Sequence, residues 1–149
     1  MKNSEFCNRE VVIASPGESI SVIAGLMKKH HSGNVIIVEY KNEKTIPVGI
    51  VTDRDIVIKV VAEGIPFDTV KASDIMSKQI YSVEEEHSIQ ETFDLMRANG
   101  IRRVPVINSK GELQGILTVD DILEIIADET SALAKTIKKE QTQEIKQIG

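Results

Sequence analysis

The sequence is short of cysteine, of aromatic residues and of long apolar runs, and each shortage excludes a class of protein. Its 149 residues include a single cysteine, Cys7, so no disulfide can form within the chain, and a reducing cytoplasm is the expected location. Nothing around Cys7 resembles a reactive-thiol pattern, so we expect an ordinary residue there. No apolar run approaches the roughly 20 residues of a membrane-spanning helix, so no membrane partner is expected.

Basic charge is also scarce, which argues against nucleic acid as a partner. Lysine and arginine number 18 against 23 aspartates and glutamates, giving a net charge of −5. Nucleic-acid binders carry a basic surplus, and single-strand binders add aromatic platforms, whereas aromatic residues here make up 3% of the chain. An anionic ligand would therefore be held by a few locally placed cations, and the position of each arginine becomes informative.

The chain does contain an internal duplication. The stretch GIVTDRDI, residues 49–56, returns as GILTVDDI, residues 115–122, with five of eight letters unchanged. Residues 11–39 align with 80–108 at a shift of 69, and the shift then falls to 66 because the first copy has a longer turn. Two copies are too few for a repeat array, so we expect a pair of packed subdomains.

Each copy has the same predicted order of elements, β-α-β-β-α. Short runs of β-branched residues alternate with helical spacing of apolar residues, as in Ile20, Ile23 and Met27. A half of about 60 residues has little core of its own, so the two sheets should pack together in a mixed α/β (α+β) fold related by a pseudo-twofold axis. The predicted divisions are a first domain at 1–63, a linker at 64–73, a second domain at 74–128 and a helical extension at 129–149.

The extension is predicted to be one long helix. No glycine or proline interrupts the chain between Asp120 and Gly149. Apolar residues recur on one side of the helix, with two polar residues in the same stripe: Leu123, Ile126, Thr130, Leu133, Ile137, Gln141, Ile145 and Ile148. Such a stripe needs a partner, most simply the same helix of a second subunit, so a homodimer is expected. The alternative is a frayed tail after Lys138, where polar residues dominate.

The repeated phrase has two interpretations. Thr52-x-x-Asp55 and Thr118-x-x-Asp121 both fit the helix-start capping box, in which a hydroxyl and a carboxylate satisfy free backbone N–H groups. A helix N-terminus is also an anion site, and a carboxylate beside it can accept two hydrogen bonds from a ribose diol. Gly49 and Gly115 would then let a ligand approach the strand backbone.

The two copies resemble the cystathionine-β-synthase (CBS) domain, a family that occurs as tandem pairs, over about residues 7–127. The second copy carries the fuller signature: Ile75-Met76-Ser77, Arg-Val-Pro-Val at 103–106, and Gly115-x-x-Thr118-x-x-Asp121. The first copy departs from it, since Phe6-Cys7-Asn8 stands where Ile-Met-Ser would be and Ile36 replaces the proline.

The resemblance implies two clefts that bind adenosine-containing ligands, with AMP, ADP or ATP expected as regulatory ligand and no catalytic cofactor. Asp55 and Asp121 would each hold a ribose diol, with Thr52 and Thr118 beside the ribose or phosphate. First-strand residues would border adenine, and two arginines match positions that reach phosphate: Val12, Ile13, Tyr81, Ser82, Arg102 and Arg103. Because such arginines often serve the opposite copy's cleft, we expect Arg102 and Arg103 to act with Asp55.

Unequal clefts are therefore predicted. The first-copy counterparts of Arg102 and Arg103 are Gly33 and Asn34, which carry no charge, so the cleft of Asp55 is expected to take the phosphorylated ligand. His30 and His31 lie near the other cleft, where they would either assist a ligand or simply end a helix. No further ligand accompanies them, so no metal site is predicted.

No catalytic constellation is found, and the chain is not expected to be an enzyme. The sequence offers no nucleophile with a base and no carboxylate pair in contrasting environments. The leading hypothesis is a stand-alone sensor of adenine nucleotides that changes the arrangement of a homodimer and signals to an unknown protein partner. The alternatives are a dimerisation scaffold with vestigial clefts, and a sensor of S-adenosylmethionine or a dinucleotide.

Overall fold

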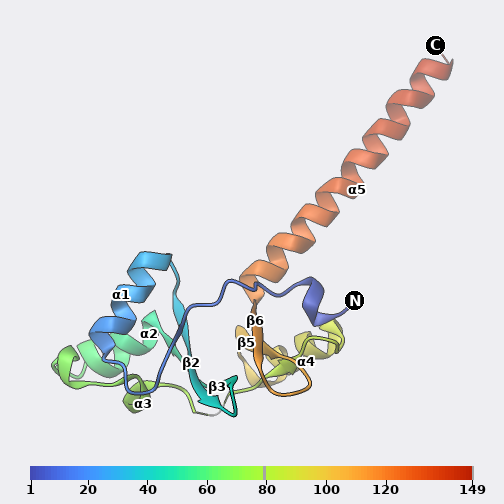
Figure 1. Cartoon of the computed structure of the whole chain (residues 1–149). Coiled ribbons are helices and arrows are strands. Elements are labelled where there is room, and N and C mark those ends of the chain that lie inside the picture. Colours follow the sequence, from blue (N-terminus) through green and yellow to red (C-terminus); the bar gives the residue numbers. More distant parts are fainter. Residues whose placement is uncertain (79, 149) are drawn as a thin grey trace.

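The computed structural model describes residues 1–78 and 80–148 and contains two three-stranded sheets, one from each copy (Figure 1). The first half comprises β1 (Ile13–Ala14), α1 (Ile20–His30), β2 (Asn34–Lys41), β3 (Lys44–Thr52), α2 (Asp53–Ile56) and the π-helical turn η2 (Val57–Val61). The second comprises β4 (Val83–Glu84), α4 (Ile89–Asn99), β5 (Arg103–Ile107), β6 (Leu113–Thr118) and α5 (Val119–Ile148). Short helices η1 (Asn3–Glu5), η3 (Phe67–Thr69) and α3 (Ala72–Ile75) precede and join the halves.

The two sheets have the same topology, which confirms the predicted mixed fold. In each sheet the short first strand runs parallel to the second, and the second and third strands form an antiparallel hairpin. The register shifts at equivalent places, between Ile37 and Val38 in one hairpin and between Val106 and Ile107 in the other. The duplicated sequence therefore produces duplicated strand pairing, down to the bulge.

Alternate residues of β2 serve two different cores. Val35 and Ile37 pack against the helices of the first half, whereas Ile36 and Val38 face the second sheet and contact Ile116. All four β2 side chains are at most 2% exposed. A strand covered on both faces needs apolar side chains at consecutive positions, which explains the unbroken run from 35 to 38.

Each hydrophobic core is completed by a segment from elsewhere in the chain. Phe6, at the end of η1, packs in the core of the second half, and Ile75, at the end of α3, packs in the core of the first. Asn8 exchanges two backbone hydrogen bonds with Ile116 of β6, both 2.9 Å, and Ser77 exchanges two with Ile50 of β3, at 3.0 and 3.3 Å. The second crossing segment begins just after the predicted linker 64–73, and both crossing segments obey the internal symmetry.

The repeated glycines make room for these crossing segments, so the close approach that they predict is made by the chain itself. A Cβ atom on Gly49 would lie 2.5 Å from the Met76 sulfur, and one on Gly115 would lie 2.7 Å from the Asn8 carbonyl oxygen. Met76 and Cys7 occupy equivalent positions in the two crossing segments. Phe6-Cys7-Asn8 therefore packs against the second sheet in the same way as Ile75-Met76-Ser77 packs against the first.

Helix α5 begins in the second half and projects away from it (Figure 1). It runs for 30 residues through Ile148, so the helical prediction is confirmed beyond Lys138; Gly149, the last residue of the predicted extension, lies outside the described residues. Ile122 is buried at its base, but every side chain from 129 to 148 is exposed. Within the described residues, no helix combines the length and apolarity needed to cross a membrane.

Substituting Gly115 tests the close crossing. Gly115→Ala should lower the free energy of unfolding by about 1–3 kcal/mol. The new methyl group would meet the carbonyl oxygen of Asn8 and push the N-terminal segment away from β6. Gly25→Ala, on the exposed side of α1 with open space around it, is the matched control and should raise stability by up to about 1 kcal/mol. Urea unfolding measures both; equal effects would contradict the crossing as a packing constraint.

Candidate ligand-binding site

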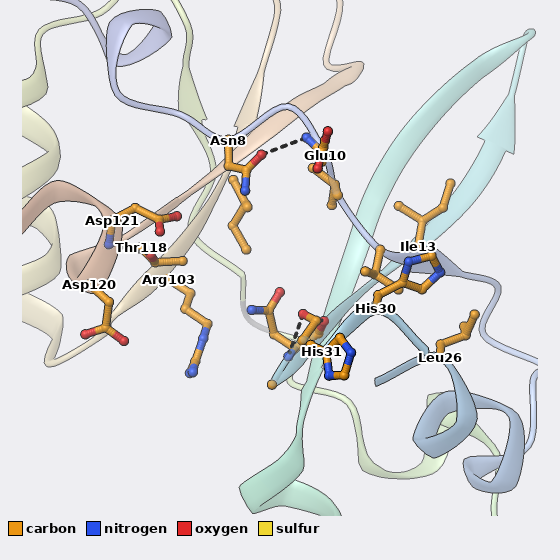
Figure 2. Close-up of a pocket in the computed structure, with 16 residues that line it drawn as sticks. Asn8, Glu10, Ile13, Leu26, His30, His31, Arg103, Thr118, Asp120 and Asp121 are labelled. Carbon is orange, nitrogen blue, oxygen red and sulfur yellow. Dashed lines mark hydrogen bonds between the residues drawn. The ribbon is translucent and has the colours of Figure 1, made fainter. Parts of the chain in front are cut away.

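A pocket of about 810 Å³ lies between the two halves and is lined by both. Figure 2 shows Thr118, Asp120, Asp121 and Arg103 of the second half on one side, facing His30, His31, Ile13 and Leu26 of the first. The N-terminal crossing segment, with Asn8 and Glu10, borders the same space. This volume falls within the range of small-molecule sites in proteins.

The β5–β6 hairpin and the first turn of α5 hold the polar side. Arg103, the first residue of β5, is the cross-strand partner of Thr118, the last residue of β6. Residues paired across antiparallel strands have neighbouring side chains, so Arg103 and Thr118 reach the same space. The Thr118 hydroxyl accepts a hydrogen bond from the Asp121 N–H at 3.1 Å, which starts α5 beside the pocket.

The two repeated aspartates have different partners, although their sequence motifs match. In the first copy both halves of the capping box form: the Thr52 hydroxyl accepts from the Asp55 N–H at 3.1 Å, and the Asp55 carboxylate accepts from the Thr52 N–H at 2.9 Å. The other Asp55 oxygen lies 3.3 Å from the ammonium of Lys59. Asp55 is thus committed to the protein, as the capping interpretation predicts.

Asp121 keeps its carboxylate available. Within residues 1–78 and 80–148, no hydrogen bond or ion pair is formed by that carboxylate, while the Asp121 backbone is capped by Thr118. The side chain is half-buried and lines the pocket. A partly desolvated carboxylate that faces a cavity is a strong acceptor for paired hydroxyl groups.

The first half supplies the opposite wall. Val12 and Ile13 line the pocket beside β1, where the resemblance expects adenine contacts. His30 and His31 end α1, and His31 has the left-handed conformation, with φ of 51°, that stops the helix. Tyr81 and Ser82, their predicted equivalents in the second half, do not line this pocket; Tyr81 packs at the edge of the second core instead.

The predicted partnership of the two arginines with Asp55 stays a prediction, but one of the two lines the pocket of Asp121. Arg103 lines the cavity of Asp121, because cross-strand pairing with Thr118 keeps it in its own half. Arg102 points elsewhere and forms an ion pair with Asp120, with a nitrogen–oxygen distance of 2.8 Å. In the pocket of Asp121, the guanidinium of Arg103 is thus present together with Gly33 and Asn34, the uncharged residues from the first copy.

Acidic groups outnumber basic groups around the cavity. Among the described residues, Glu10, Asp120 and Asp121 line it together with one guanidinium, that of Arg103, and Asp120 is already paired with Arg102. His30 and His31 add nitrogen donors or acceptors on the opposite wall. Such a site suits a ligand of small net negative charge better than a polyphosphate.

Sequence reasoning missed the contribution of the N-terminal segment. Asn8 and Glu10 line the pocket, and the Asn8 side-chain oxygen accepts a hydrogen bond from the Glu10 N–H at 2.9 Å. The shift of 69 residues aligns Asn8 with Ser77. That alignment, followed beyond Val11 toward the N-terminus, would have indicated that residues 6–8 cross to the second sheet.

Two expectations about reactive groups can be examined in the structure. Among the residues it describes, no three histidine, cysteine or acidic side chains gather as metal ligands would. Burial raises the pKa of the Cys7 thiol, which lowers its thiolate fraction at neutral pH. Cys7 packs beside the second core, under Gly115.

Comparison with known proteins identifies the family. The model of the CBS domain matches residues 4–62 and 72–128, so the chain belongs to the CBS-domain family as a tandem pair. An uncharacterised protein of Methanopyrus kandleri is 42% identical over 137 residues, covering 92% of this chain and 68% of the relative. A CBS domain-containing protein of Bacillus subtilis is 32% identical, covering 76% of each chain.

Solved structures share the fold. A CBS domain protein of Pyrobaculum aerophilum, complexed with AMP, superposes with a TM-score of 0.72 at 29% identity, covering 81% of this chain and 89% of its own. The hexameric CBS-CP12 protein of bloom-forming cyanobacteria gives a TM-score of 0.73 at 32% identity, covering 83% and 69%. Similar proteins thus include one with bound AMP and one that forms oligomers.

The different partners of the two aspartates predict different stability effects. Asp55→Ala should lower the free energy of unfolding by about 1 kcal/mol, because it removes a reciprocal cap and the contact with Lys59. Asp121→Ala should change it by less than about 0.5 kcal/mol, since Thr118 still caps α5. Chemical denaturation without ligand measures both, and a larger loss for Asp121→Ala would contradict this assignment.

Proposed function

We propose that this protein is a non-catalytic regulatory module that binds an adenosine-containing ligand in the cleft of Asp121, with AMP as the best-fitting nucleotide. One observation carries the proposal: the Asp121 carboxylate faces an 810 Å³ cavity without a hydrogen-bonding partner in the described part of the chain. Its counterpart Asp55 has both oxygens engaged. The AMP complex of a similar protein supports the ligand class.

Each wall of the cleft has a role in this proposal. Asp121 accepts hydrogen bonds from the ribose diol, and Val12 and Ile13 contact adenine through backbone groups and apolar surface. Thr118 and Arg103 meet the phosphate, with the planar guanidinium suited to two of its oxygens. His30 and His31 face the same part of the cavity from α1 and offer further hydrogen bonds.

Charge favours a monophosphate over longer phosphate chains. A phosphate monoester carries about −1.5 to −2 charges at neutral pH, and each additional phosphate adds more. Arg103 is the one guanidinium lining the cavity within the described residues, where Glu10 and Asp121 oppose it. We therefore expect affinity to fall from AMP to ADP to ATP.

The same acidic surplus supports a second candidate. A cationic adenosine compound such as S-adenosylmethionine would present the same ribose to Asp121 and a positive group to Glu10 or Asp120. Arg103 would then be a hindrance and not a ligand. The two candidates therefore differ in the sign of the effect expected from removing that arginine.

A second ligand site at Thr52, Asp55, Tyr81 and Ser82 stays a prediction. To bind ribose there, the Asp55 carboxylate would have to exchange its contacts with Thr52 and Lys59 for contacts with the ligand. That exchange costs part of the binding energy. We therefore propose that the cleft of Asp121 fills first.

Signalling in this proposal passes through the base of α5. Asp120 lines the cavity and pairs with Arg102, which also lines an apolar groove at the base of the helix. A bound phosphate near Arg103 repels Asp120 and loosens that ion pair, which shifts the balance between two dimer arrangements. The module acts as a homodimer on a further protein, and the single cysteine supports a cytoplasmic location.

A thermal-shift panel tests ligand binding. AMP at about 100 times its dissociation constant should stabilise the protein by about 2.7 kcal/mol, with smaller effects of ADP and ATP at equal concentration. Asp121→Ala should abolish the response because the diol loses its acceptor. Asp55→Ala is the matched control and should keep it, starting from a lower melting temperature.

The panel includes S-adenosylmethionine and adenosine, so that it separates the alternatives. A response to S-adenosylmethionine alone favours the second candidate. No response to any adenosine compound at millimolar concentration refutes the sensor proposal and leaves a dimerisation scaffold with vestigial clefts.

Arg103→Gln tests phosphate recognition. Loss of the guanidinium should weaken AMP binding by about 1.5–3 kcal/mol, roughly 10- to 100-fold, and bring its affinity close to that of adenosine. Arg102→Gln, whose side chain lies outside the cavity, should leave the ratio of AMP to adenosine affinity unchanged. Isothermal titration measures both ratios. Stronger binding of S-adenosylmethionine after Arg103→Gln would instead indicate that the natural ligand is cationic.

A further inference from the structure

An apolar groove lies at the base of α5, beside the ion pair of Arg102 with Asp120. Its volume is about 520 Å³, and its apolar lining comes from α4, from the start of α5 and from the loop between α4 and β5: Phe93, Met96, Ile101, Ile122, Leu123 and Ile126. Arg97 and Arg102 stand at its rim. The side chains of Leu123 and Ile126 are 59% and 44% exposed, so this surface is open in the single chain.

The groove continues along α5 as an apolar stripe. Beyond Ile126 the stripe passes Thr130, Leu133 and Ile137, at alternating intervals of four and three residues, which is the spacing of a coiled-coil seam. Leu133 and Ile137 are 68% and 58% exposed. Groove and stripe together form one surface that a helix of matching length would cover.

We propose that α5 of a second copy covers this surface in the antiparallel direction, so that residues 137–148 of each copy lie in the groove of the other. The proposal extends the homodimer proposed above by fixing its interface and direction. It does not depend on which ligand, if any, occupies the cleft of Asp121.

The positions of the seam residues suit an antiparallel pair. A twofold axis through the peptide between Ser131 and Ala132 places Ile126 opposite Ile137 and Thr130 opposite Leu133. Every seam layer between Ile126 and Ile137 then contains at least one aliphatic side chain. A parallel pair would instead align Thr130 with Thr130 of the second copy.

Charge along α5 also favours the antiparallel direction. The first part of the helix is acidic, with Glu124, Asp128 and Glu129, and the middle is basic. The basic residues are Lys135, Lys138 and Lys139. Antiparallel pairing about the same axis brings each acidic part beside the basic part of the second copy, whereas parallel pairing brings like charges together.

The rim of the groove extends this complementarity. Glu140 and Glu144 of the second copy would lie level with Leu123 and Val119, where the groove is flanked by Arg97 and Arg102. Each arginine already contacts one carboxylate, Asp94 at 2.9 Å or Asp120 at 2.8 Å, but both side chains are largely exposed. An exposed guanidinium has further N–H donors for a second carboxylate.

The spacing of apolar residues after Ile137 suits packing in a groove better than it suits a further stretch of coiled coil. After Ile137 the next positions on the same face are Gln141, Ile145 and Ile148, and the two successive intervals of four residues break the heptad spacing. An inserted interval of four residues unwinds the supercoil locally. A straight helix end of this kind can lie against a domain surface, which is what the groove provides.

Spin-label distances in the full chain test the direction of the pair. With Cys7→Ser as background, a label introduced by Lys146→Cys should give a distance of about 45 Å in an antiparallel dimer, since the two positions are 29 residues apart along the pair. A parallel dimer would bring the same labels within about 20 Å. A label introduced by Ser131→Cys, near the twofold axis, is the matched control and should give a short distance in both arrangements.

A charge exchange provides a second, independent readout. Glu140 of the second copy would lie at the groove rim beside Arg97, so Glu140→Lys should weaken dimerisation roughly tenfold, and Glu140→Lys with Arg97→Glu should restore it. Sedimentation equilibrium at low salt measures the dissociation constants, and circular dichroism checks that each variant keeps its helix content.

Each result supports or overturns the interface. The long distance for position 146 together with rescue by the double exchange supports it. A short distance for position 146, a failed rescue, or a monomer at all concentrations overturns it, and a monomer would mean that the groove serves a different protein. Equilibrium dialysis with AMP, performed on the same samples, tests the proposed ligand function separately.

Discussion

Two crossed segments hold this protein together, and the rest of its architecture depends on them. Residues 6–8 pack on the second sheet and residues 75–77 on the first, each against a glycine that admits the neighbouring backbone or side chain. Neither core is complete without a segment that belongs, in sequence order, to the other part of the chain. The halves are therefore expected to fold as one cooperative unit, and the cleft between them has walls of fixed separation.

The same crossing explains which parts of the structure were predictable. Strands and helices followed from local periodicity, and the duplication carried each assignment from one copy to the other, so that even the bulges agree. The packing of Phe6 in the core of the second half could not be predicted from the residues around it, because Phe6 joins buried residues that lie 80 or more positions away in the sequence.

The candidate site shows a second limit of inference from a repeat. The two Thr-x-x-Asp motifs are identical in pattern, yet Asp55 finds Lys59 four residues later, whereas the equivalent of Lys59 in α5 is Ile125. Lys59 thus gives the Asp55 carboxylate a partner, in addition to the Thr52 N–H, that Asp121 lacks within the described residues. The arginines show a related limit: cross-strand pairing places Arg103 beside Thr118, and a family pattern does not specify that register.

The length of α5 has a mechanical consequence. Its first turn carries Asp120 and Asp121 at the cleft, and its 30 residues extend for about 45 Å, mostly free of the body that anchors them. A rigid rod held at one end acts as a lever, so a tilt of only about 5° at the anchored turn would displace the tip by roughly 4 Å over that length. Sub-ångström adjustments among side chains at the root are in this way converted into movements large enough for another macromolecule to detect.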